Sequence, residues 1–422
     1  MVSSFKFNNL VKVTVHSTAL LGLFLSSSFV AFSAQDNNNQ APKATAEEAK
    51  IKHWNVPEIE RNFWDIPELE KAFFDASPTD YDDGILVDDF ADKSVDEKKI
   101  IALAEEIADK QHAEVDSLLI AHQGKLVFES YFSRGRIDLP HPQSSTTKSY
   151  TGLAIGRAIQ LGYLSMADLD KPLVSFLKGL DPSKFSKGVD KITLRNAMAM
   201  QSGLQISPEQ IEEYRKNPDN FVGIKQIQAF LEDSAEITDA SQSFVYQGLN
   251  PDMLMYVVEA AVPGSAADFV EKELFHKMGI VNYDWRADQS GMLAAGGGSS
   301  ITSRDMLKLG TLVMNKGKWN GEQLIPKSFI EQSTSKNVQL SVEQVQDFYS
   351  GENLSNSGYG YLWWQTDLRV GDKQYQSVSA QGGGGVTILF VKELDLLVVV
   401  TAHARQAYLQ MIAEKVLPAF IT

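Results

Sequence analysis

The sequence of 422 residues contains no cysteine. Without thiols, the chain cannot form disulfides, thiolate zinc sites or a cysteine nucleophile. Basic residues are also in deficit, because 39 Lys and Arg stand against 54 Asp and Glu and give a formal charge of −15. Nucleic acids and anionic membranes are bound through clustered Lys and Arg, so we expect neither as a partner.

Several signatures of common enzyme classes are missing as well. The chain has no G-x-S-x-G nucleophile elbow, no H-E-x-x-H zinc motif, no P-loop and no dinucleotide-binding fingerprint. Its histidines lack the spacing of metal ligands, and we expect no metal and no organic cofactor. The composition, 43% hydrophobic and 22% charged, is that of a globular protein rather than a disordered chain.

Residues 1–34 differ from the rest of the chain. Two lysines precede an apolar stretch over residues 19–32, which ends in small residues, and no acid occurs before Asp36. This order predicts a secretory signal peptide cleaved at about residues 31–34. Three consecutive serines interrupt the apolar run, which disfavours a retained anchor of about 20 apolar residues. We therefore expect a secreted or periplasmic product with no stable membrane anchor after cleavage.

The remaining chain divides into three parts by composition. Residues 35–50 are polar without an apolar period and predict a flexible linker. Residues 51–96 contain a Trp/Pro/Phe repeat, with one copy at 54–63 and the other at 64–73. Each copy predicts one or two helical turns. This extension is either a docking arm or lid, or a segment that packs its aromatic side chains on the main domain, which spans residues 97–422.

Hydrophobic periodicity predicts the order of elements in this main domain. A helix is expected near residues 97–111, followed by a strand pair over 115–132. Strands are expected again near 387–401, and a last helix after them. The stretch between, with a lobe at about 165–330, is mainly helical by pattern. The prediction is an α/β (α+β) fold: a mainly antiparallel sheet shared by both ends and flanked by helices, plus an all-helical lobe and a cleft between them.

The pattern S-x-x-K provides a candidate nucleophile. It occurs four times, but only the copy at Ser145 and Lys148 opens a helix rich in small residues. Three residues along a helix bring the lysine to the same face as the serine, within reach of its hydroxyl. A serine needs a base to take its proton, and a buried neutral lysine can serve. By itself the pattern also fits an N-terminal cap with a solvated lysine.

The longer context of this motif resembles the serine hydrolases of the class C β-lactamase-related superfamily, most closely its esterase and 6-aminohexanoate-dimer hydrolase branch. The segments that carry the resemblance lie in the expected order at residues 144–154, 162–168, 192–204, 295–298 with 303–305, 316–321 and 359–364. The resemblance covers about residues 115–415. It implies a β-lactamase/transpeptidase-like fold with Ser145 as nucleophile and Lys148 as base.

Two further motifs of the superfamily are placed by the same resemblance. The Tyr-x-Asn or Tyr-x-Ser motif falls at residues 246–248 and makes Tyr246 the proton-shuttling phenol, if Lys148 lowers its pKa. Alternatively, Tyr246 is a buried packing aromatic. The third position of this motif is Gly248, which offers no side chain to orient the lysine or the substrate.

The Lys-Thr-Gly or His-x-Gly motif aligns best with residues 380–382. Gly383 then supplies the second N–H of the oxyanion hole beside that of Ser145, and Gln381 and Gly382 are expected to line the substrate site. A bulge at the start of a strand is the structural alternative for this glycine run. Ala380 replaces the Lys or His that would meet a substrate carboxylate.

Trp363 and Trp364 are expected either to contact the substrate or to pack in the core. The whole pattern predicts a hydrolase that cleaves a small neutral ester or amide through a Ser145 acyl-enzyme. A peptidoglycan-acting D,D-peptidase or penicillin-binding relative is the first alternative. The second is a non-catalytic binding protein on the same fold, which the departures at Gly248 and Ala380 would permit.

Overall fold

The computed structural model describes residues 40–51, 62–90, 95–345, 351–404 and 408–421. The expected signal peptide, the first part of the linker and most of the first repeat copy lie outside these residues. Residues 40–50 are packed against the domain rather than forming the flexible linker that their polarity predicts. The reason is a buried ion pair, in which Glu48 accepts a hydrogen bond from Arg136 at 3.0 Å.

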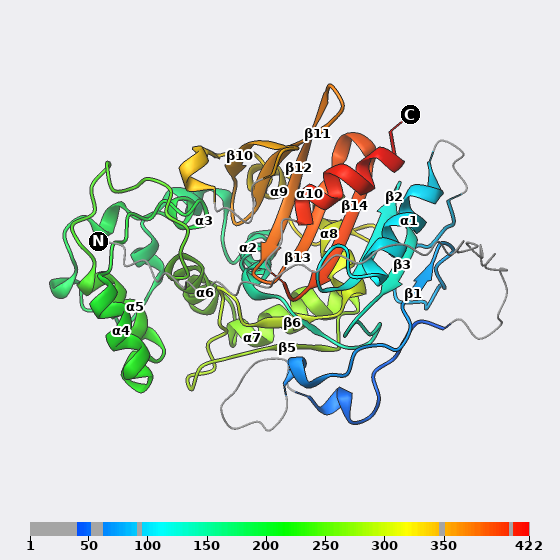
Figure 1. Ribbon diagram of the computed structural model, residues 1–422. Helices are drawn as coiled ribbons and strands as arrows, with labels where there is room; N and C mark the ends of the chain where they lie inside the picture. The colour runs from blue at the N-terminus through cyan, green and yellow to red at the C-terminus, as the bar shows by residue number, and fades with distance from the viewer. Residues whose placement is uncertain (1–39, 52–61, 91–94, 346–350, 405–407, 422) are drawn as a thin grey trace, which may run out of the picture. The chain divides into compact units, whose positions relative to one another are not determined.

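Within the described residues, nine strands form one antiparallel sheet in the order β1-β3-β2-β14-β13-β12-β11-β10-β9 (Figure 1). Strands from both ends of the chain lie side by side because β2 pairs with β14, which confirms the predicted shared sheet. The strands are β1 Phe73–Asp75, β2 Val115–His122, β3 Lys125–Tyr131, β9 Val338–Gln339, β10 Leu354–Tyr359, β11 Trp364–Val370, β12 Lys373–Gly382, β13 Val386–Val391 and β14 Leu396–Ala402.

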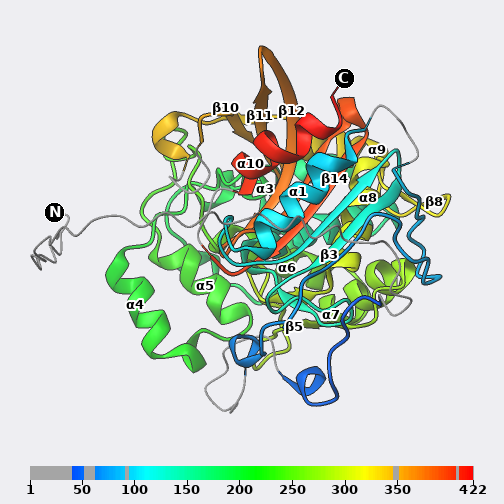
Figure 2. The ribbon, with the colours of Figure 1, turned by 45° about the vertical axis from the view of Figure 1, so that its right-hand side comes forward.

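Helices cover both faces of the sheet. One face packs against α1 (Glu97–Ala108) and the C-terminal helical segment that begins with α10 (Tyr408–Met411), which lie side by side in Figure 2. The other face packs against α2 (Thr147–Gln160) and α8 (Ser303–Met314). Both faces are apolar because the central strands β13 and β14 carry mostly apolar residues at successive positions, and their side chains point alternately to opposite sides.

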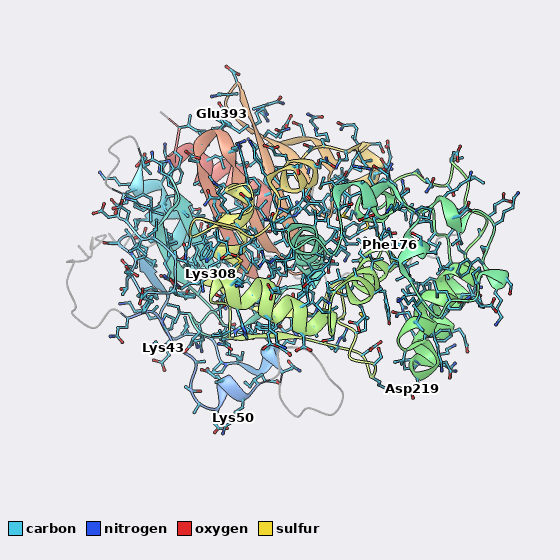
Figure 3. The ribbon with its side chains drawn as sticks, turned by 180° about the vertical axis from the view of Figure 1, so that it is seen from behind. Lys43, Lys50, Phe176, Asp219, Lys308 and Glu393 are labelled. Atoms are coloured by element: carbon cyan, nitrogen blue, oxygen red, sulfur yellow. The ribbon has the colours of Figure 1, made fainter. Side chains whose placement is uncertain are left out.

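The stretch between β3 and β9 is mainly helical, as its pattern predicts. Figure 3 shows this region from behind, with Asp219 near its far end and Lys308 on α8. Its other helices are α3 Leu194–Met198, α4 Pro208–Lys216, α5 Ile224–Asp233, α6 Leu249–Ala261, α7 Ala266–Phe269 and α9 Lys327–Ser333. The stretch is not wholly helical, because it also contains the short strands β4 His141–Pro142, β5 Tyr283–Trp285, β6 Ser299–Ile301, β7 Lys318–Trp319 and β8 Glu322–Gln323.

The extension before α1 packs on the domain instead of standing free. Its second repeat copy is not helical beyond a short 3₁₀ turn, Phe63–Asp65. The chain then continues without helix or strand up to β1, and it is tied to the domain because the Leu69 N–H donates to the Ser133 carbonyl at 2.7 Å and Arg136 donates to the Pro67 carbonyl at 2.9 Å. These long-range bonds replace the predicted helical turns, and the segment ends in β1.

No single helix among the described residues is long and apolar enough to cross a bilayer. Residues Leu249–Ala261 and Ala266–Met278 reach the required length and composition only when taken together, and they are bent by 85°. Most side chains of α6 are buried in the core of the domain.

We predict that Phe63→Ala lowers the free energy of unfolding by about 3 kcal/mol, because the ring is 1% exposed and packs with Ile51, Ile66 and Leu139. Urea unfolding followed by circular dichroism measures the change. The matched control is Leu86→Ala, whose side chain is 67% exposed and should cost no more than about 0.5 kcal/mol. Equal effects of the two substitutions would contradict the packed arrangement of the extension.

Candidate active site

Ser145 lies in a 3₁₀ turn, Ser144–Thr146, that runs directly into α2. The preceding residue, Ser144, has a φ of +47°, a strained value for a residue with a side chain. The turn is anchored to the neighbouring small sheet because the Gln143 N–H donates to the Ser299 carbonyl at 2.9 Å. Its backbone position is therefore held from outside the helix.

Lys148 lies in the first turn of α2 and is 5% exposed. Its Nζ is 3.0 Å from Ser145 Oγ and 2.6 Å from the carbonyl oxygen of Gly296. Burial lowers the pKa of Lys148 to about 8, although the negative charge of Asp252 opposes this shift. About a tenth of the amine is then neutral at pH 7. The lysine is thus not a solvated surface residue.

Tyr246 precedes α6 and closes the other side of the serine. Its phenol is hydrogen-bonded to Ser145, and Lys148 Nζ lies 5.0 Å from its ring centroid. Burial raises the pKa of Tyr246 to about 12, despite the hydrogen bond from Ser145. The condition that Lys148 lowers this pKa is therefore not met, because desolvation dominates. The phenol keeps its proton at neutral pH and can relay one only as a neutral group.

Asp252 is a member of the site that sequence reasoning missed. It lies on α6, where the Ala295 N–H donates to its carboxylate. Burial raises the pKa of Asp252 to about 7, and Lys148 and Arg286 counteract this rise. The sequence contains only a weak signal for this residue, which is one acid within the apolar helix that follows the tyrosine motif. Its charge acts on Lys148, so the two groups titrate as a coupled pair.

The end of β12 forms the wall opposite α2. Pairing with β11 stops at Ser379, whereas pairing with β13 continues to Gly382. A Cβ at Gly382 would lie 2.3 Å from the Gln143 carbonyl oxygen, so only glycine fits against the turn of Ser145. Gly383 follows, and a Cβ there would be 3.9 Å from Ser144. The glycine run is therefore the end of β12 and its turn into β13, not a bulge at a strand start.

Residues 380 and 381 do not bring a polar side chain to Ser145. Ala380 is fully buried on the same strand face as Gly382. Gln381 points to the opposite side, because alternate residues of a strand face opposite ways. There its Nε2 donates to Ser379 Oγ at 2.8 Å. The Gln381 side chain is therefore bound within its own strand, and its expected contact with a substrate stays a prediction.

The two tryptophans are packed rather than open to a substrate. Trp363 is 1% exposed, and its ring lies 6.4 Å from that of Phe390 in the core. Trp364 is 4% exposed and packs on Tyr246, with ring centroids 5.2 Å apart. Trp364 thus supports the ring of Tyr246, whereas Trp363 belongs to the core.

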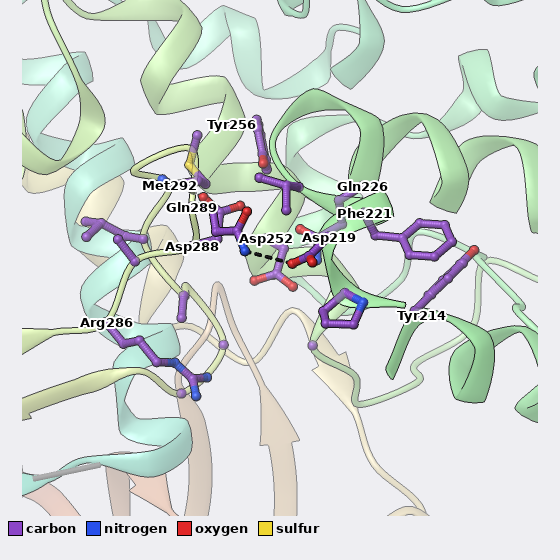
Figure 4. A pocket seen from close by; sticks show the side chains of 18 residues that line it. Tyr214, Asp219, Phe221, Gln226, Asp252, Tyr256, Arg286, Asp288, Gln289 and Met292 are labelled. Atoms are coloured by element: carbon purple, nitrogen blue, oxygen red, sulfur yellow. Dashed lines mark hydrogen bonds between the residues drawn. The ribbon is translucent and has the colours of Figure 1, made fainter. Parts of the chain in front are cut away.

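A pocket of about 640 Å³ opens beside the Gly296 carbonyl that Lys148 contacts (Figure 4). On the side of the site it is lined by Gly248, Gly296 and Gly297. Its charged and aromatic wall consists of Asp219, Asp252, Asp288, Arg286, Tyr214, Phe221 and Tyr256. Three carboxyl groups against one guanidinium give this wall an acidic surplus. Among the described residues, no group of three or more His, Asp and Glu side chains is arranged to hold a metal ion.

Comparison with known proteins gives one decisive match. The sequence profile of the Beta-lactamase family covers residues 100–416 of this chain, about three quarters of it. The chain belongs to the beta-lactamase family of serine hydrolases. The match includes Ser145, Lys148 and Tyr246 as well as the glycine run after β12.

Relatives of this family member are distant in sequence. An uncharacterized protein of Alkalihalophilus pseudofirmus is 22% identical over 67% of this chain and 82% of its own. Among solved structures, a proposed beta-lactamase from Bacteroides dorei has a TM-score of 0.61 at 16% identity, covering 77% of this chain and 99% of that chain. A proposed 6-aminohexanoate-dimer hydrolase from Bacillus anthracis has a TM-score of 0.55 at 22% identity, covering 75% and 79%. These structures share the fold.

Gly248 and Ala380 are the two positions at which the sequence predicts departures from the family motifs, and their surroundings differ. Gly248 is the residue before α6 and has a φ of −80°, and a Cβ there would meet nothing within 4 Å. The missing side chain therefore leaves open space at the pocket. Ala380 is enclosed by the core, so this family member has neither a cation nor room for one at that position.

We predict that kcat/KM for a neutral ester rises with pH and levels off above an inflection near 8. The reason is that the base form of Lys148 is the unprotonated amine, whose fraction grows as pH passes its pKa of about 8. Initial rates between pH 6 and 10 on a substrate with no ionisable group measure the profile. A rate that falls across this range would contradict the role of Lys148 as base.

Asp252→Asn tests whether Lys148 is the group that titrates in this profile. Removing the carboxylate removes the charge that raises the pKa of Lys148, so the inflection should move to lower pH. An inflection that moves to higher pH would show that the charge of Asp252 does not act on the titrating group.

Proposed function

We propose that the protein hydrolyses a small ester or amide through an acyl-enzyme on Ser145. The observation that carries this proposal is the 3.0 Å contact between Lys148 Nζ and Ser145 Oγ, made by an amine that burial brings to a pKa of about 8. An activated serine needs a base within hydrogen-bonding distance that can be neutral near physiological pH. Lys148 meets both conditions.

In the first step the Ser145 hydroxyl gives its proton to neutral Lys148, and Oγ attacks the substrate carbonyl carbon. The carbonyl π electrons move to oxygen and produce the tetrahedral oxyanion. The backbone N–H groups of Ser145 and Gly383 are the proposed donors to that oxyanion. Their placement is supported by the close approach of Gly382 and Gly383 to the turn of Ser145.

Collapse of the tetrahedral species breaks the bond between the carbonyl carbon and the leaving group. The leaving alcohol or amine takes a proton from Lys148, relayed through the neutral phenol of Tyr246, which is hydrogen-bonded to Ser145. Water then attacks the acyl-enzyme, Lys148 takes a proton from that water, and the acid product leaves as Ser145 Oγ regains a proton.

The charge around the site favours a substrate without a carboxylate near the scissile bond. Ala380 offers no cation, and the pocket wall carries Asp219, Asp252 and Asp288 against Arg286. A carboxylate-bearing acyl group would be repelled there, whereas a neutral or cationic group would be accepted. The Bacillus anthracis neighbour is described as a proposed 6-aminohexanoate-dimer hydrolase, which agrees with a hydrolytic role.

The peptidase alternative has less support. Peptides ending in D-alanine present a carboxylate, which the residues at positions 380 and 248 cannot bind. A purely binding role has less support too, because the nucleophile, base and phenol lie together as hydrolysis requires. We further propose that the enzyme acts outside the cytoplasm, on the basis of the signal-like composition of residues 1–34.

We predict one stoichiometric fluorophosphonate adduct on Ser145, because the activated hydroxyl attacks phosphorus as it attacks a carbonyl. Intact-mass measurement and peptide sequencing locate it. Ser145→Ala should form no adduct and lose at least about 1,000-fold in kcat. Ser175→Ala is the matched control, since this serine shares the S-x-x-K pattern but makes a local bond to Pro172 instead. An adduct elsewhere, or activity of Ser145→Ala within tenfold of the parent, would exclude this nucleophile.

We also predict that p-nitrophenyl esters are discriminated by the charge at the end of their acyl chain. A chain ending in a carboxylate should have a kcat/KM at least about tenfold below those of equally long chains ending in methyl or ammonium. Asp219→Asn should narrow this difference, since it removes one exposed carboxylate of the pocket wall. Equal rates for the three esters would contradict the proposed role of the pocket.

A further inference from the structure

Asp116 is a buried carboxylate outside the catalytic set. It lies on β2 and is 0% exposed. Its Oδ2 accepts hydrogen bonds from His403 Nδ1 at 2.7 Å and from His141 Nε2 at 3.0 Å, while Oδ1 accepts from the Arg134 N–H at 2.8 Å. Burial alone would raise the pKa of Asp116, but the bonds from the two imidazoles outweigh it and lower the pKa. The carboxylate is therefore ionised at neutral pH.

The partners of the two imidazoles define which atoms donate. Arg134 Nη1, which can only donate, lies 2.8 Å from His403 Nε2. This nitrogen therefore accepts, although Glu114 Oε2 is also 3.2 Å away, and Nδ1 carries the proton that goes to Asp116. His141 Nδ1 lies 2.9 Å from the Pro142 carbonyl, so both of its nitrogens face acceptors. An ionised carboxylate can only accept, so His141 Nε2 carries the proton of its bond to Asp116, and both imidazoles donate to the same oxygen.

Each histidine is connected to one half of the proposed oxyanion hole, His141 to the turn of Ser145 and His403 to the turn of Gly383. His141 belongs to β4, four residues before Ser145 on the same short segment. His403 directly follows β14, and the N–H of the next residue, Ala404, donates to the Gly384 carbonyl at 3.1 Å. Gly384 is the neighbour of Gly383 in the turn after β12. The Asp116 carboxylate is therefore hydrogen-bonded to a histidine of each segment. The N–H groups of these two segments must point at the same oxyanion.

We propose that Asp116 is a positioning residue, which fixes the distance between the N–H groups of Ser145 and Gly383 by holding His141 and His403. The inference rests on the proposed function, because it assigns a role only if these two groups stabilise an oxyanion. Donors aimed at the developing charge act through their placement. A displacement of about 1 Å in a catalytic group can cost about 100-fold in rate.

Asp116→Asn tests this role at nearly constant volume. The amide keeps one oxygen for the Arg134 N–H but replaces the shared oxygen by a donor, which cannot accept from both imidazoles. With a p-nitrophenyl ester, kcat should fall about 10- to 100-fold while KM changes by less than about threefold. The rate of fluorophosphonate labelling of Ser145 should fall in parallel.

A pair of histidine variants keeps the test informative if Asp116→Asn does not fold. His403→Asn retains an N–H near the position of Nδ1, whereas His403→Leu removes the donor. His403→Asn should keep kcat within about threefold, and His403→Leu should lose as much as Asp116→Asn. Equal kcat values for the two histidine variants would overturn the proposal.

Glu129→Gln is the matched structural control. Glu129 is a buried carboxylate on the neighbouring strand β3, bound to Arg304 at 2.7 Å and to Tyr131 at 2.6 Å, and it contacts neither half of the oxyanion hole. This variant should lose stability but keep kcat within about twofold. The proposal is overturned if Asp116→Asn, folded by circular dichroism, keeps kcat within twofold, or if Glu129→Gln loses kcat equally. Absence of any Ser145 adduct in the parent protein would instead refute the proposed function.

Discussion

Exclusion of water from one lysine amine is the constraint on which the site depends. A solvated lysine holds its proton at neutral pH and cannot take another from a serine. Lys148 differs from a solvated lysine because α2, α6 and the Gly296 segment enclose it and lower its pKa to about 8. The Gly296 carbonyl and the charge of Asp252 offset part of the cost of burial. An amine with this pKa therefore exists only in the folded protein, where three distant segments meet.

The antiparallel sheet provides the rigid frame for this meeting. β12 extends beyond the residues that pair with β11 and ends in the glycine turn, which lies against the turn of Ser145. β2 and β14 lie farther along the same sheet and carry the groups that tie these two turns together, Asp116 and the residues after Ala402. A site built between a sheet edge and a helix start is held by strands on one side and by a packed helix on the other. Its geometry thus follows from sheet register as much as from the catalytic side chains.

Two departures from the family motifs distinguish this member in chemistry rather than in fold. Ala380 is buried where a cation could meet a substrate carboxylate, and Gly248 leaves space at the entrance of an acidic pocket. Under the proposed function, both positions favour neutral or cationic substrates over anionic ones.

Features that depend on local periodicity can be predicted from the amino-acid pattern alone. The strand pair over residues 115–132, the strands near 387–401 and the helix that aligns Lys148 with Ser145 follow from alternation and helical spacing, and the structure confirms them. Properties that depend on burial arise only when the chain is folded. These are the neutral phenol of Tyr246, the influence of Asp252, the direction of Gln381 and the irregular, non-helical course of residues 66–72. Desolvation and long-range hydrogen bonds arise from residues far apart in the chain, and no local pattern encodes them.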